Sequence, residues 1–194
     1  MRFSSYIVSL MAAGAVAAPH NDNWQNGNKH SKVVTKFDSD LGPSYGLSTD
    51  QENAIHLHNE ARKAVGNDPL SWDDTLASGA QEWADHLASK GLLQHSQGDD
   101  GENLYMGTSD SPYSAAVKAF LAEDSQYNGE AISGSNYMSF GHYTQCVWKN
   151  TTKVGMGVSK DSSGTSWVVA RYQKPGNMQV PKKRIFMLHS LILI

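Results

Sequence analysis

The apolar positions of this chain recur at helical spacing in three stretches between residues 48 and 123. This periodicity predicts helices over about 48–65, 73–90 and 111–123, because residues three and four apart share one face of a helix. Ser48 with Gln51 fits a capping box, as does Thr49 with Glu52, and Pro112 takes the first position of the third helix. The faces predicted to be buried are Ala54, Leu57, Ala61 and Ala64; Leu76, Ala80, Trp83, Ala84 and Leu87; and Ala116, Val117, Phe120 and Leu121.

Shorter apolar runs after residue 140 indicate a last helical turn followed by two strands. We expect the turn over 142–147 and the strands over 154–158 and 167–172, on either side of a polar turn that contains Ser163-Gly164. Gly155 and Gly157 recur at period two, which strips one face of the first strand of side chains. A helix can therefore pack closely against that face.

Both ends of the chain differ in composition from this middle part. Residues 1–17 combine Arg2, a short apolar stretch and the small residues of a cleavage site, so they are interpreted as a signal peptide. Residues 18–47 are polar and predict a flexible leader. One domain is expected over 48–179. Residues 180–194 form a divergent apolar tail, either a genuine end or an error in the gene model, and are too short to span a bilayer. We therefore expect a secreted protein with no stable transmembrane anchor.

Composition narrows the choice of partners. The chain has 194 residues, is 39% hydrophobic and carries a formal net charge of -3. These values suit one domain with a buried core, and the absence of a basic footprint predicts no nucleic-acid partner. Cys146 is the single cysteine, so no disulfide can form within the chain. We expect its thiol to be buried and inert rather than nucleophilic.

The segment from Gly141 to Thr151 reads Gly-His-Tyr-Thr-Gln-Cys-Val-Trp-Lys-Asn-Thr. It resembles the first signature motif of the CAP superfamily, which contains cysteine-rich secretory proteins, venom antigens and plant pathogenesis-related proteins. Such a motif is far more specific than a lone histidine. The resemblance covers about residues 50–178. It implies an α+β fold, a three-layer α-β-α sandwich with a small antiparallel sheet, and a secreted domain that binds ligands.

Four ionisable residues match the polar cavity residues of that family: His95, Glu102, Glu123 and His142. The resemblance implies that they converge in one cleft. Two imidazoles and two carboxylates suit a divalent metal such as zinc or magnesium, with His95 and His142 as ligands. Taken singly, each residue also fits an ordinary loop, turn, helix end or core position. We find none of the common hydrolase motifs, so no catalytic residue is assigned.

A second candidate site is the segment from Tyr127 to Phe140, where apolar side chains are spaced among Gly and Ser. The corresponding loop binds sterol in the fungal CAP proteins that this segment resembles. The candidate lipid-binding residues are Tyr127, Ile132, Tyr137, Met138 and Phe140. The alternative is a surface loop whose aromatic side chains pack onto the core.

The resemblance, together with these residues, implies three candidate functions. The first is extracellular binding and export of sterols or related small lipids. The others are a metal-dependent hydrolase that uses the His/Glu cleft, and a pathogenesis-related or effector-like module with an extracellular protein partner. Asn150-Thr151-Thr152 is also an N-glycosylation sequon, unless a buried helix end blocks its modification.

Overall fold

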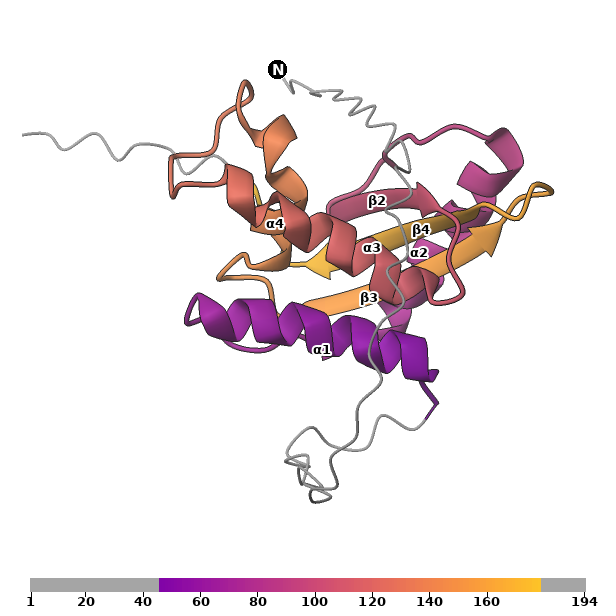
Figure 1. The fold of residues 1–194 in the computed structure, drawn as a ribbon, viewed down its shortest axis with the longest axis horizontal. Coiled ribbons are helices and arrows are strands. Elements are labelled where there is room, and N and C mark those ends of the chain that lie inside the picture. The colour runs from indigo at the N-terminus through magenta and orange to yellow at the C-terminus, as the bar shows by residue number, and fades with distance from the viewer. Residues whose placement is uncertain (1–45, 179–194) are drawn as a thin grey trace, which may run out of the picture.

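The computed structural model describes residues 46–178, which form four α-helices and a four-stranded sheet (Figure 1). The predicted signal peptide, nearly all of the polar leader and the apolar tail lie outside the described residues. The elements are α1 (Thr49–Ala64), β1 (Ser71–Trp72), α2 (Asp74–Lys90), β2 (Gly101–Gly107), α3 (Pro112–Leu121), the 3-10 helices η1 (Ala122–Gln126) and η2 (Tyr137–Ser139), α4 (Gly141–Cys146), β3 (Lys153–Lys160) and β4 (Ser166–Gln173). No helix within 46–178 is both long and apolar enough to cross a membrane.

Local signals set the helix ends close to their predicted positions. Ser48 caps α1 through a reciprocal capping box, in which the Ser48 N–H donates to Gln51 Oε1 at 2.8 Å. Asp73 caps α2 by accepting the Leu76 N–H at 3.0 Å, and Gly91 ends that helix in the left-handed conformation at φ 64°. Pro112 begins α3 as expected. These features satisfy backbone groups that helix ends would otherwise leave unpaired.

The sheet is mixed, with strand order β1-β3-β4-β2. The predicted pair β3 and β4 is antiparallel, and β2 adds to β4 in the same sense. The short β1 runs parallel to β3, with Ser71 opposite Lys153, so the sheet is antiparallel as expected except at this edge. Two residues carry too little periodicity to reveal a strand in the sequence.

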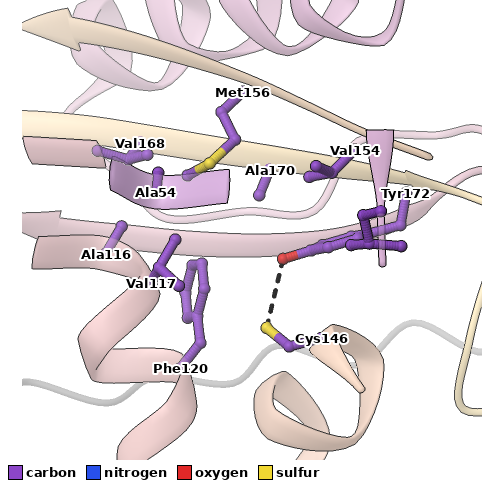
Figure 2. Packing of buried hydrophobic residues seen from close by; sticks show 11 residues of the cluster. Ala54, Ala116, Val117, Phe120, Cys146, Val154, Met156, Val168, Ala170 and Tyr172 are labelled. Atoms are coloured by element: carbon purple, nitrogen blue, oxygen red, sulfur yellow. Dashed lines mark hydrogen bonds between the residues drawn. The ribbon is translucent and has the colours of Figure 1, made fainter. Parts of the chain in front are cut away.

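Helices cover both faces of the sheet, which completes the three-layer sandwich. The α2 helix packs on one face, where a side chain at Gly155 or Gly157 would collide with the helix backbone. The predicted close approach at these glycines is confirmed. On the opposite face, α1, α3 and α4 enclose a second core, part of which is drawn in Figure 2. Its members include Phe120, Met156 and Tyr172.

The buried face of α1 differs from the predicted stripe. Ala54 is buried, but Ala64 is exposed, and the remaining buried positions are His58 and Arg62. The His58 Nδ1 group donates to the Ala54 carbonyl at 2.9 Å, so Nε2 accepts from the Tyr172 hydroxyl at 2.9 Å. Burial lowers the pKa of His58 to about 4, which keeps this ring neutral.

Arg62 is fully buried and bonds to backbone carbonyls rather than to a carboxylate. Its Nε group donates to Asp68 O at 2.6 Å, and Nη1 donates to Cys146 O and Trp148 O at 3.0 and 2.9 Å. Nη2 donates to Thr151 O at 2.8 Å. One side chain of α1 thereby fixes the end of α4 and the turn before β3. The signature segment spans this helix and most of this turn.

Cys146 is buried, as expected, and burial raises the pKa of its thiol to about 12. Its Sγ atom lies 3.5 Å from the Tyr172 hydroxyl, the contact drawn as a dashed line in Figure 2. The thiol is therefore protonated at neutral pH, which makes it a poor nucleophile.

Candidate functional site

Glu123 and His142 form the first half of the site, where η1 meets the start of α4. Glu123 Oε2 accepts the backbone N–H groups of His142 and Tyr143 at 2.9 and 3.2 Å. The His142 Nδ1 group donates to Glu123 Oε1 at 2.6 Å. The His142 ring also stacks on Phe120, with a centroid distance of 5.2 Å. One carboxylate thus holds both the ring and the backbone of His142.

His95 and Glu102 form the second half in a similar way. The His95 Nδ1 group donates to Glu102 Oε1 at 2.9 Å, and the same oxygen accepts the Ser96 N–H at 2.9 Å. The Ser96 hydroxyl donates to Glu102 Oε2 at 2.6 Å. Burial acts to raise the pKa of Glu102, but the hydrogen bonds from His95 and Ser96 outweigh it and hold that pKa below its ordinary value. Glu102 is therefore an ionised acceptor.

Both imidazoles line the same hollow, as does Glu102, so three of the four predicted cavity residues meet there. This hollow has a volume of about 50 Å³. A neighbouring groove of about 240 Å³ is lined by His95, His142 and Glu123. Each Nδ1 group donates to a carboxylate, so the Nε2 atom of each ring remains available to a ligand. Neither Nε2 atom has a hydrogen-bond partner among residues 46–178.

The residues predicted to bind lipid do not act as one group. Tyr137 and Met138 line the hollow beside the imidazoles. Phe140 is only 2% exposed, and its ring packs against Tyr127 at a centroid distance of 4.9 Å. Ile132 is half-buried and does not line the hollow. Phe140 is thus placed in the core, which leaves Tyr137 and Met138 as the side chains of this segment that a ligand in the hollow would touch.

The sequence analysis did not identify several residues that support the site. Arg171 lies opposite Glu102 in the sheet, and its Nη2 group donates to Ser96 Oγ at 3.2 Å. Asn103 donates to the His142 carbonyl at 3.1 Å, which ties β2 to α4. Asn177 donates to the Gly141 carbonyl at 2.8 Å. The one available signal was Arg171, a charged residue inside an otherwise apolar strand.

A divalent metal in the hollow would meet the imidazoles of His95 and His142. Within residues 46–178, no three side chains of His, Cys, Asp or Glu are grouped to hold an ion. Two Nε2 atoms remain available, each on a ring that a carboxylate orients, as at many zinc sites. The oxygens of both carboxylates are already engaged, which disfavours magnesium, an ion that prefers oxygen ligands.

Asn150 lies in the turn between α4 and β3, and its side chain is exposed. Thr152, the third sequon position, is also exposed, whereas Thr151 is buried. The acceptor Asn150 is therefore not enclosed in a buried helix end, the alternative that would have blocked its modification. An oligosaccharide at Asn150 would extend into solvent.

With the fold and this geometry established, we compared the chain with known proteins. Residues 55–172 match the family model described as CAP, the cysteine-rich secretory protein family. The chain belongs to the CAP family. The matched residues lie within the part of the chain that the structure describes, and they contain the whole of the His/Glu site and the whole signature segment.

Curated CAP relatives include plant and fungal proteins. Pathogenesis-related protein 1A of Nicotiana tabacum is 38% identical over 128 residues, which cover 66% of this chain and 76% of that protein. Secreted protein RBT4 of Candida albicans is 37% identical over 130 residues, which cover 66% of this chain and 35% of RBT4. These relatives are pathogenesis-related and secreted proteins.

Solved CAP structures support the fold. NaASP2, solved with Zn²⁺, matches with a TM-score of 0.57 and 24% identity, covering 71% of this chain and 86% of that one. BmVAL-1 matches with a TM-score of 0.56 and 22% identity, covering 70% and 82% of the two chains. The predicted α-β-α sandwich is thereby confirmed.

Proposed function

We propose that this CAP protein is secreted and that it binds and exports sterols or related small lipids through the hollow beside His95 and His142. The observation that carries the proposal is the position of Tyr137 and Met138, which offer apolar surface next to the two free Nε2 atoms. A ligand with an apolar body and a polar end would match this combination.

The hollow must open to admit such a ligand, because small-molecule pockets usually measure about 300–1,000 Å³. The segment from Tyr127 to Ser139 is suited to this movement. None of its side chains is fully buried, so moving it away from the hollow would expose little core. Phe140, which directly follows, is buried and would anchor the end of the moving segment.

Removing the apolar wall is expected to weaken sterol binding. We expect the double variant Tyr137→Ala/Met138→Ala to bind a fluorescent sterol about tenfold more weakly, since losing ~1.4 kcal/mol of contact with the ligand changes affinity by that factor. The measurement is saturable binding by purified protein. Val65→Ala is the matched control, because Val65 is an exposed apolar residue outside the hollow. Unchanged affinity of the folded double variant would refute the assignment of this wall.

We also propose that the two imidazoles hold a divalent metal, with zinc favoured over magnesium. His95 and His142 would supply the ligands, and Glu102 and Glu123 would orient the rings. A bound zinc ion supplies Lewis acidity, which is the property that a metal-dependent hydrolase would require.

Zinc binding is expected to depend on both rings. Calorimetric titration should show binding that is lost in His95→Gln/His142→Gln and retained in His86→Gln, whose exposed ring stacks on Trp83 away from the hollow. Glu102→Gln should weaken binding by about 10–100-fold, the usual effect of removing a carboxylate that orients a ligand. Binding should also fall in acid, because a ligating imidazole must be unprotonated. Equal heats for wild type and the double histidine variant would place any zinc elsewhere.

We propose that Asn150 carries an N-linked oligosaccharide when the protein passes through a secretory pathway. Its exposed turn and the exposed Thr152 provide the access that modification needs. Secreted protein should lose mass on treatment with an N-glycan amidase, and the Asn150→Gln variant should not. An amidase-insensitive mass of the wild-type protein would contradict the proposal.

A further inference from the structure

β2 is an edge strand. It pairs with β4 along all seven of its residues, from Gly101 opposite Tyr172 to Gly107 opposite Ser166, and no strand of the described chain lies on its other side. An edge of this kind leaves backbone N–H and C=O groups that can pair with another chain. Natural proteins usually block such edges with charged residues or proline. The single charge in β2 is Glu102, which is engaged by His95 and Ser96.

The groove of about 240 Å³ follows this free edge. Three consecutive residues of β2 line it, namely Leu104, Tyr105 and Met106. Successive side chains of a strand point to opposite faces of the sheet, so a groove that touches all three must pass along the strand's edge. One wall comes from Ala119 and Phe120 of α3, and the other comes from the segment that contains Leu93 and Gln94.

We propose that this edge groove is a docking site for an extended peptide, which adds to the sheet beside β2. The free backbone groups decide the class of ligand. A lipid tail in the groove would cover them without pairing them, at a cost of ~1–3 kcal/mol for each buried group. An extended peptide offers matching donors and acceptors, and its alternate side chains would enter the apolar groove.

Charge further specifies the peptide. Glu123 lines the groove, and the exposed Asp124 follows it in η1. These two carboxylates complement a basic residue of the peptide. Met106 stands 43% exposed at the strand, where it offers apolar surface to the side chains that point inward. The ligand is thus a strand-forming segment with alternating apolar positions and a basic residue.

The proposal concerns a different ligand from the lipid, although the groove adjoins the lipid hollow at His95 and His142. The test begins by selecting binders to the purified protein from a phage-displayed library of linear dodecapeptides. The selected sequence is then made as synthetic peptides in which single backbone nitrogens are methylated. We expect methylation along one edge of the bound strand to weaken binding at least tenfold, and methylation at the intervening positions to leave it within twofold.

Protein variants locate the site. Met106→Lys should weaken the peptide at least tenfold, whereas Val65→Lys, a similarly exposed apolar position on another surface, should bind within twofold of wild type. Amide hydrogen exchange of residues 104–106 in the wild-type protein should slow when the peptide binds. Failure to select any binder, equal tolerance of every methylated position, or unchanged exchange at β2 would each overturn the proposal. Sterol binding is measured separately on the wild-type protein, so a lipid result leaves this conclusion untouched.

Discussion

Replacing Arg62 with leucine is expected to lower the free energy of unfolding by about 3–5 kcal/mol, the scale seen when one partner of a buried charged network is removed. The reason is the set of four backbone carbonyls that the guanidinium satisfies, those of Asp68, Cys146, Trp148 and Thr151. Leucine fills part of the volume but donates no hydrogen bond, so the buried carbonyls of Cys146 and Thr151 would lose this donor, as would the partly buried carbonyls of Asp68 and Trp148.

Urea unfolding of the variant and of Lys63→Ala measures this effect. Lys63 is the next residue of α1 and is exposed, so its replacement should change stability by no more than about 0.5 kcal/mol. Arg62→Lys should lie between the two, because one ammonium cannot reach all the carbonyls that the planar fork reaches. A stable Arg62→Leu protein would show that water or a local rearrangement replaces the guanidinium.

Adding a single methyl group at Gly155 or Gly157 is expected to cost about 1–3 kcal/mol at each position, as overpacking of a well-packed interior does. A β-carbon at Gly155 would lie 2.6 Å from the Asp73 carbonyl oxygen, and one at Gly157 would lie 2.6 Å from the Ala80 carbonyl carbon. Both obstacles are backbone atoms, so no side-chain rotation can relieve the collision, and α2 would have to move away from the sheet.

Gly98→Ala is the matched control for these two variants, because a β-carbon there meets no atom within 4 Å and the backbone is not left-handed. In thermal melts, the Gly155→Ala and Gly157→Ala variants should have clearly lower melting temperatures than the Gly98→Ala variant. If Gly155→Ala and Gly157→Ala melt together with Gly98→Ala, the contact between α2 and β3 is looser than the structure shows.

The His/Glu site depends on the same packing. Glu123 positions His142 from η1, which directly follows α3, while Arg171 of β4 supports Ser96 and Glu102 from the sheet. Each imidazole is therefore fixed from a different layer of the sandwich. Loss of the α2–sheet or α1–α4 contacts should consequently weaken ligand binding as well as stability, although Arg62, Gly155 and Gly157 do not line the hollow.

Much of the fold was predictable because its signals are local. The capping box at Ser48, the cap at Asp73, Pro112 and Gly91 act within one or two turns of the backbone. Their effect therefore depends little on what the rest of the chain does. The glycine pair in β3 likewise marked a bare strand face. The signature segment identified the family, and the resemblance to that family indicated the four cavity residues. The spacing of these residues along the chain did not by itself predict that they converge.

The tertiary structure decided the features that depend on distant partners. His58 and Arg62 are buried because Tyr172 and the carbonyls after α4 satisfy them, and no local pattern foretells such partners. Phe140 joined the core while Tyr137 and Met138 stayed beside the imidazoles, a division made by the position of α4. β2 is an edge strand because, among the described strands, it pairs with β4 alone. The sequence by itself therefore determined the four α-helices, the β3–β4 pair and the family. Long-range packing determined the other two strands, which polar groups are buried and which surfaces remain open to a ligand.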